Sequence, residues 1–200
     1  MQFSELNLSK EFLQNLDSLE YKTLTLIQEK TIPLTLIPEQ TIPDALQNKD
    51  LIAKAKTGSG KTVAFCLPIV NKLKAKEFKI QALILAPTRE LANQIAQNLR
   101  NLSRHIHNVK VLTLCGGVPF KPQVVSLQHN AHIVVATPGR VLKHIKEKNI
   151  NLENISTFVL DEADKMLDMG FYDDIMEIIE DLPRNRQTML FSATSEKKLE

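Results

Sequence analysis

Long apolar runs are missing from this sequence, and none approaches the roughly 20 residues that a membrane-spanning helix needs. The N-terminal stretch MQFSELNLSKEF also lacks the apolar core of a signal peptide. Cysteine is scarce, and the spacing of Cys66 and Cys115 fits neither a metal site nor a redox motif, so both are expected to be free thiols in a reducing compartment. These absences predict a cytoplasmic protein that does not enter a membrane.

A strong excess of one charge is missing as well. The net charge is only +2, so any nucleic-acid-binding surface must be local. Hydrophobic residues make up 43% and charged residues 24% of the 200 residues, which is typical of one ordinary globular domain. Five histidines without convincing metal-ligand spacing argue against a zinc site: His105, His107, His129, His132 and His144.

Short apolar, β-branched runs alternate with stretches of helical periodicity. The expected strands lie within residues 50–55, 79–88, 108–117, 131–138, 157–164 and 187–195, and the expected helices within 62–76, 89–106, 139–149 and 165–182. Apolar strands separated by helices indicate an α/β fold, with a parallel sheet covered on both faces. Ligands bind such sheets at the carboxyl ends of the strands, and these strands end in GSGKT, PTREL, GG, TPGR, DEAD and SAT.

The stretch AKTGSGKT at residues 55–62 follows an expected strand and opens an expected helix, which is the setting of a phosphate-binding loop. Its glycines allow backbone N–H groups to turn toward phosphate oxygens. Lys61 is predicted to reach the β- and γ-phosphates of ATP, and the Thr62 hydroxyl to bind Mg²⁺. A glycine-rich turn with an exposed lysine is the weaker alternative. The predicted nucleotide-binding residues here are Ala55, Lys56, Thr57, Gly58, Ser59, Gly60, Lys61 and Thr62.

The stretch VLDEAD at residues 159–164 is an apolar strand that runs into acids. Asp161 is predicted to hold Mg²⁺ through water, and Glu162 to orient and deprotonate the attacking water. Taken alone, such acids are more often a solvated turn or the start of a helix, but the phosphate-binding loop favours the catalytic interpretation.

Together these motifs resemble the DEAD-box RNA helicase family over the whole chain. The resemblance rests on AKTGSGKT, on Asp161-Glu162-Ala163-Asp164, on Phe3 upstream of Ile27-Gln28, and on PTREL, GG, TPGR and SAT in the family's order. It implies a RecA-like P-loop domain. The segment CGGVPF…SLQH…HIVVATPGR resembles more narrowly the bacterial DbpA-type helicases.

The resemblance also implies roles for the remaining motifs. Backbone contacts to RNA are implied for Pro87, Thr88, Arg89, Gly116, Gly117, Thr137, Pro138, Gly139 and Arg140. Coupling of the nucleotide state to RNA strand separation is implied for Asp164, Ser192, Ala193 and Thr194. Without the other motifs, PTREL could be a plain strand end and helix start, and SAT a plain turn.

The family's motor has two RecA-like domains, and the motifs of the second are absent here. That domain supplies arginines that typically contribute roughly 10³–10⁵ in rate, so this half alone is expected to hydrolyse ATP very poorly. Two functions stay open: the N-terminal half of an ATP-dependent RNA helicase, or a nucleotide- and RNA-binding module that is inactive by itself. A DNA helicase is a distant third possibility, which a preference for 2′-OH-bearing strands would exclude.

Residues 24–33 read LTLIQEKTIP and residues 34–43 read LTLIPEQTIP, a tandem duplication with two changes. In the family, an aromatic residue and a glutamine upstream of the phosphate-binding loop recognise adenine (the Q motif), which implies these roles for Phe3 and Gln28. Gln28 lies 30 residues before Gly58, ten more than is usual in the family, while Pro38 stands at the usual distance but has no amide. We expect Gln28 to bind adenine and residues 34–43 to be extruded as a bulged loop or short extra helix. The alternative is that residues 44–50, which are continuous with the second copy, draw that copy into the groove, in which case adenine selectivity would be lost. The domain division is therefore 1–43 for the Q-motif segment and 44–200 for the ATP-binding domain.

Overall fold

A six-stranded, all-parallel sheet forms the centre of the molecule. The computed structural model describes residues 5, 6, 8–21, 41–54 and 61–193. The strands are β1 (Leu51–Lys54), β2 (Ala82–Leu85), β3 (Val111–Leu114), β4 (Ile133–Ala136), β5 (Thr157–Leu160) and β6 (Gln187–Ser192), in the order β1-β6-β5-β2-β4-β3. The predicted fold class and all six predicted strands are confirmed.

The central strands are buried on both faces, because the residues of β2 and β4 are apolar at every position and those of β5 at every position except Thr157. In β2, Ala82 and Ile84 point into one hydrophobic core, and Leu83 and Leu85 point into another on the opposite face. A strand with one solvated face would alternate apolar with polar residues instead. The uninterrupted runs in the sequence therefore position β2, β4 and β5 inside the sheet.

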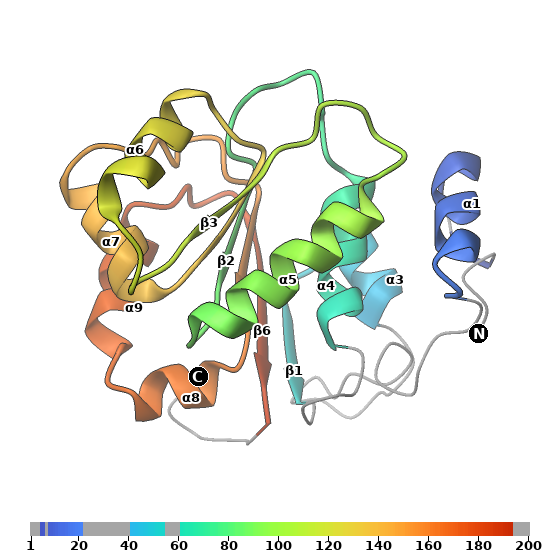
Figure 1. The fold of residues 1–200 in the computed structure, drawn as a ribbon. Helices are drawn as coiled ribbons and strands as arrows, with labels where there is room; N and C mark the ends of the chain where they lie inside the picture. The colour runs from blue at the N-terminus through green and yellow to red at the C-terminus, as the bar shows by residue number, and fades with distance from the viewer. Residues whose placement is uncertain (1–4, 7, 22–40, 55–60, 194–200) are drawn as a thin grey trace.

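Helices form a layer on each face of the sheet (Figure 1). The layer on one face comprises α1 (Lys10–Ser18), α3 (Thr41–Leu46), α4 (Lys61–Asn71) and α5 (Arg89–Leu102), and the layer on the other comprises α6 (Phe120–Gln128), α7 (Pro138–Lys146), α8 (Ala163–Asp168) and α9 (Tyr172–Glu180). None of the helices in the described ranges is long and apolar enough to cross a membrane.

Between the strands, the helices differ from the expectation in two places. Helix α6 was not predicted, because Pro119 and Pro122 lie in a stretch with little helical periodicity. The single stretch expected over residues 165–182 is two helices, α8 and α9. They are separated at Gly170, which has φ +80°, a conformation that favours glycine and ends α8.

The end of the duplicated segment is part of the folded domain. Helix α3 starts at Thr41, inside the second copy, and continues through Leu46. The Ile42 side chain is 0% exposed and belongs to the core on the α4–α5 face. The expectation that residues 34–43 are extruded is therefore wrong for residues 41–43, and α3 crosses the proposed domain boundary. Phe3 and Gln28 lie outside the described residues.

Candidate functional site

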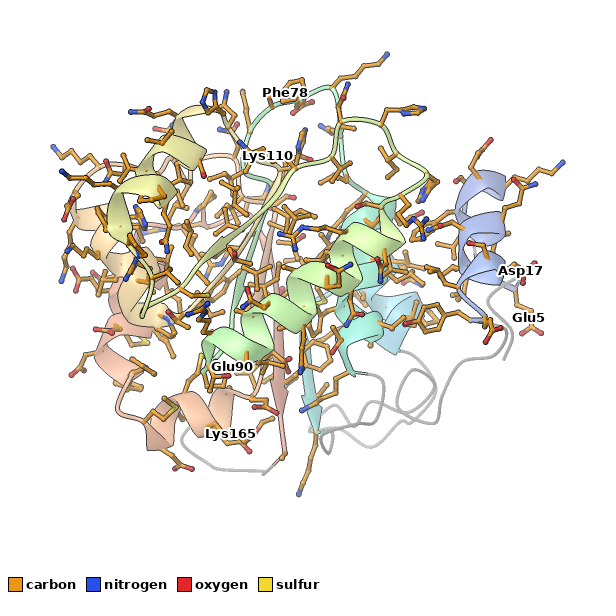
Figure 2. All side chains as sticks on the ribbon, viewed as in Figure 1. Glu5, Asp17, Phe78, Glu90, Lys110 and Lys165 are labelled. Atoms are coloured by element: carbon orange, nitrogen blue, oxygen red, sulfur yellow. The ribbon has the colours of Figure 1, made fainter. Side chains whose placement is uncertain are left out.

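The strand order divides the motifs into two groups along the carboxyl ends of the strands. Strands β1, β6 and β5, which precede GSGKT, SAT and DEAD, lie side by side; strands β2, β4 and β3, which precede PTREL, TPGR and GG, lie beyond them. Figure 2 labels residues at both ends of the strands. Glu90 and Lys165 follow β2 and β5 and lie at the carboxyl ends, whereas Phe78 and Lys110 precede β2 and β3 and lie at the amino ends. All the predicted motifs thus follow the carboxyl ends of their strands, where the sequence places a site.

Lys61 and Asp161 form the buried centre of the first group. Lys61 begins α4, Asp161 follows the last residue of β5, and their Nζ and Oδ1 atoms are 4.0 Å apart. Both side chains are almost fully buried, yet neither Lys61 Nζ nor Asp161 Oδ1 has a hydrogen-bond partner among the described residues. Burial raises the pKa of Asp161 from 3.8 to about 6, although the nearby Lys61 charge acts in the opposite direction.

These unsatisfied atoms test whether the site fits a nucleotide and Mg²⁺. A buried ammonium group and a buried carboxylate oxygen without partners cost stability unless a ligand completes their hydrogen bonds. Phosphate oxygens accept hydrogen bonds from a lysine at a helix N-terminus, and water bound to Mg²⁺ donates to a carboxylate. The residues present therefore fit Mg²⁺-bound ATP. Thr62, the predicted metal ligand, lies half-buried beside Lys61, while residues 55–60 lie outside the described ranges.

Glu162 has an unusual backbone conformation. Its φ of 54° and ψ of 49° place it in the left-handed region, which costs free energy for a residue other than glycine. Its Oε2 atom lies 2.9 Å from Lys165 Nζ, and the hydrogen bond to Glu162 raises the pKa of Lys165. The turn brings Glu162, which is almost fully buried, next to Asp161. Lys165 was not predicted as a site residue; its only signal in the sequence is helical i,i+3 spacing after an acid.

Asp164 and the SAT motif are in contact. The Ala193 backbone N–H donates to Asp164 Oδ2 at 3.0 Å, while the Lys165 N–H donates to Asp164 Oδ1 at 3.1 Å. Ser192 is the last residue of β6 and is buried. The structure thus brings together three of the four residues predicted for coupling, and Thr194 lies outside the described residues.

In the second group, PTREL joins β2 to α5. Pro87 is buried, whereas Thr88 and Arg89 are exposed. Thr88 is the N-cap of α5, since its Oγ1 accepts a hydrogen bond from the Leu91 N–H at 3.2 Å. The motif therefore does begin a helix, and exposure leaves the Arg89 side chain accessible to a ligand.

The GG and TPGR loops are hydrogen-bonded to each other. The Gly116 N–H donates to Thr137 Oγ1 at 3.3 Å, and Gly117 has φ +74°. Gly139 lies in the first turn of α7, after Pro138, and a Cβ atom there would lie 3.2 Å from Asp174 Oδ2. Both guanidinium Nη atoms of Arg140 donate to the Val118 carbonyl, at 3.1 and 3.0 Å. Arg140 thus has a structural role in addition to the predicted RNA contact.

Other sites receive no support from the described residues. No group of three or more His, Cys, Asp or Glu side chains among them could hold a metal ion by itself. A groove of about 720 Å³ lies between the C-terminal ends of α6, α7 and α9, lined by residues such as Asn130, Asn149 and Glu177. Those helix ends lie away from the strand ends that carry the motifs, so we do not assign the chemistry to this groove.

Known proteins share this architecture and sequence. The family model described as DEAD/DEAH box helicase matches residues 35–200. The chain is 50% identical to the ATP-dependent RNA helicase DbpA of Escherichia coli, covering 96% of this chain and 40% of that protein. It is 47% identical to the ATP-dependent RNA helicase CshA of Listeria monocytogenes, covering 96% of this chain and 35% of that protein. A crystal structure of a DEAD box protein from Methanococcus jannaschii superimposes with a TM-score of 0.90 at 38% identity, over all of this chain and 52% of that one.

Proposed function

The chain belongs to the DEAD/DEAH box helicase family, and from this premise we propose that it is the N-terminal, ATP- and RNA-binding half of an ATP-dependent RNA helicase. The chain spans about 35–40% of the length of the two relatives described above. The proposed activity, RNA-dependent ATP hydrolysis coupled to local unwinding of an RNA duplex, therefore belongs to this half joined to a second RecA-like domain. The chain is similar to both DbpA and CshA, so identity alone does not choose between them. The DbpA-type assignment therefore rests on the segment CGGVPF…SLQH…HIVVATPGR.

One observation carries this proposal: the buried Lys61–Asp161 pair, whose facing atoms have no hydrogen-bond partner among the described residues. We assign Lys61 Nζ to the ATP phosphates, and Thr62 Oγ1 and Asp161 to Mg²⁺, the latter through water. Bound Mg²⁺ would neutralise charge on the phosphates. Glu162 orients the attacking water and accepts its proton, and the strained turn holds its carboxylate beside Asp161. Residues 55–60 complete the phosphate-binding loop in this proposal, and Phe3 and Gln28 bind adenine.

We assign the RNA to the edge formed by the loops after β2, β3 and β4. Exposed Thr88 and Arg89, the GG loop and the TPGR turn offer hydroxyl, guanidinium and backbone N–H groups, which suit phosphates and 2′-OH groups rather than base edges. The contact between Asp164 and Ala193 supports a coupling role for DEAD and SAT, because it joins the ends of β5 and β6 next to the nucleotide site. We place the protein in the cytoplasm, where reduced thiols such as Cys66 and Cys115 persist.

An ATPase titration tests the proposal. RNA is titrated into the 200-residue chain with ATP and Mg²⁺, alone and with a second RecA-like domain added. A helicase half should show little turnover alone and RNA-stimulated turnover with the added domain, since that domain supplies the missing arginines. If the chain binds ATP and RNA but turnover stays absent in both arms, the binding-module alternative is correct. If DNA stimulates turnover as well as RNA does, the proposed substrate is wrong.

A further inference from the structure

A buried polar pair lies between α6 and α7, behind the loops assigned to RNA. His144 is 0% exposed and Gln123 is 7% exposed. The Gln123 Nε2 amide donates to the Cys115 carbonyl at 3.0 Å, which leaves its Oε1 facing His144 Nε2 at 3.2 Å. Because that oxygen can only accept, His144 carries its proton on Nε2 and donates it. The chain of bonds therefore runs from His144 through Gln123 to the residue that precedes Gly116.

The same histidine supports this loop a second time through an aromatic stack. The Phe120 ring lies on the His144 imidazole, with centroids 4.2 Å apart and an interplanar angle of 17°. The Arg140 guanidinium lies 5.6 Å from the centroid of the same ring and donates both Nη hydrogen bonds to Val118. Loop 115–120 is thus held at Cys115, Val118 and Phe120, and each point connects directly or through one side chain to α7.

The pair is poorly suited to stabilise the core alone. Its environment keeps the imidazole neutral, because burial and the Arg140 charge lower the pKa of His144 to about 4. His144 Nδ1 is buried and has no hydrogen-bond partner in the described part of the chain. An unpaired buried nitrogen costs free energy, and an apolar side chain would fill the same space without that cost.

We propose that His144 is a positioning residue of the RNA site: acting through Gln123 and Phe120, it fixes the Gly116–Gly117 loop and Arg140 relative to Thr137. The expected effect on RNA affinity rests on the proposed function, whereas the positioning of the Gly116–Gly117 loop does not. The Gly116 N–H, which donates to Thr137, reports that geometry directly. Misplacing a loop that contacts phosphates weakens several hydrogen bonds together, although no RNA-contacting side chain is lost.

His132 offers a matched control at the other edge of the sheet. It too is 0% exposed; its Nδ1 accepts the Lys110 N–H at 3.1 Å, and its Nε2 lies 3.1 Å from the Ala75 carbonyl oxygen. Both ring nitrogens are paired, so His132→Leu should lower stability at least as much as His144→Leu does. Any loss of RNA affinity through general destabilisation would therefore appear in both variants.

The experiment compares wild type, His144→Leu, His144→Gln and His132→Leu in the 200-residue chain. Fluorescence anisotropy measures binding of a short labelled oligouridylate, calorimetry measures binding of Mg²⁺-ATP, and NMR measures hydrogen exchange at the Gly116 amide. His144→Leu should raise the RNA Kd by roughly tenfold, as loss of about one hydrogen bond to a charged group does. It should also speed Gly116 exchange and leave the ATP Kd unchanged. His144→Gln keeps a hydrogen-bond donor at this position. Its RNA Kd and its Gly116 exchange rate should therefore both lie closer to the wild-type values than those of His144→Leu. His132→Leu should change neither.

Slow Gly116 exchange in folded His144→Leu would overturn the inference, as would equal RNA losses in His144→Leu and His132→Leu. Failure of the proposed function gives a different result. The wild-type chain would then not bind the oligouridylate, while Gly116 exchange would still decide whether His144 positions the loop. If His144→Leu does not fold, Gln123→Leu takes its place, since it removes the link to Cys115 and leaves the imidazole stacked on Phe120.

Discussion

Asp161 is the residue in which folding and function are most clearly opposed. Burial raises its pKa from 3.8 to about 6, so between about pH 4 and pH 6 the folded chain binds more protons than the unfolded chain. Its contribution to the free energy of unfolding is therefore present at low pH and is lost as the pH rises through 6. Above pH 6 the ionised carboxylate, the form that the proposed Mg²⁺ site requires, destabilises the free protein.

Asp161→Asn should consequently increase the free energy of unfolding at pH 8 by up to about 3 kcal/mol, the equivalent of the pKa difference. Binding of Mg²⁺-ATP should be strongly weakened in the same variant. Urea unfolding at pH 5 and pH 8 without nucleotide measures the first effect. Asp168→Asn, at an exposed position of α8, is the control and should change stability by less than about 0.5 kcal/mol. If Asp161→Asn is less stable than wild type at pH 8, the ionised Asp161 carboxylate does not destabilise the free protein.

Lys61 and Glu162 should separate nucleotide binding from hydrolysis. Lys61→Ala removes a charge directed at the phosphates and should weaken ATP binding by roughly 10- to 100-fold. Glu162→Gln keeps the shape but loses the base, so binding should persist while turnover in the presence of the second domain falls by roughly 10²–10⁴. Calorimetry and a steady-state ATPase assay measure the two effects. Glu162 is not the base if Glu162→Gln loses binding as severely as Lys61→Ala does.

The sequence predicts the identity of these residues better than their surroundings. Lys61, Asp161 and Glu162 are identifiable because their motifs follow apolar strands, and the sheet then brings them together. Their burial, the left-handed turn at Glu162 and the ion pair to Lys165 depend on packing between distant segments, which no local pattern encodes. His144 shows the same limit, because the spacing of the histidines in the sequence cannot reveal its contact with Gln123.

At the scale of elements, Thr88 has two roles that must be tested separately. Thr88→Ala removes the N-cap of α5 and should lower the free energy of unfolding by about 1 kcal/mol, which would confuse an RNA-binding measurement. Thr88→Asp keeps a capping oxygen and adds a negative charge at the proposed RNA edge. It should therefore retain stability and lower RNA affinity for every sequence tested. Undiminished RNA binding by Thr88→Asp would exclude this loop from the site.

Helix α3 makes the duplicated segment testable by deletion. Removing residues 24–33 or residues 34–43 leaves the same TIPDAL sequence for α3, and the two products differ at only two positions. The product without residues 24–33 has Pro and Gln there, whereas the product without residues 34–43 has Gln and Lys. Both should fold with similar stability. Only the product that keeps Gln28 should prefer ATP to GTP, because an amide that pairs with adenine discriminates against other bases.

Nucleotide affinities of the intact chain complete this comparison. If Gln28 binds adenine across the extra ten residues, the intact chain should also prefer ATP. A preference that arises only after deletion of residues 34–43 would show that the second copy holds the site. Helix boundaries of this kind follow from tertiary packing: Ile42 is buried against the core, and propensity alone does not distinguish it from its repeat, Ile32.

For the whole molecule, the alternation of strands and helices predicts a parallel sheet, and the motif order predicts which edge carries the site. The strand order goes beyond that information. It separates strands β1, β6 and β5, which precede the proposed nucleotide site, from strands β2, β4 and β3, which precede the proposed RNA site, with β5 and β2 meeting at the boundary. Asp164 lies on the nucleotide side of this boundary and Thr88 on the RNA side. In the proposed arrangement, the two ligand sites therefore meet where β5 pairs with β2.

The position of β6 also has a consequence for how the protein is made. Strand β1 pairs with β6 alone in the described sheet, so the strand leading into the phosphate-binding loop waits for residues 187–192, which the ribosome adds more than 130 positions later. Until then β1 has no partner strand in the described sheet, and β5 exposes the edge that β6 will occupy. A nascent chain released after residue 186 should stay sensitive to protease and fail to retain Mg²⁺-ATP, whereas release after residue 200 should give resistance. Pulse proteolysis of the two released chains would measure this late step, in which the proposed nucleotide site forms only after β6 has been made.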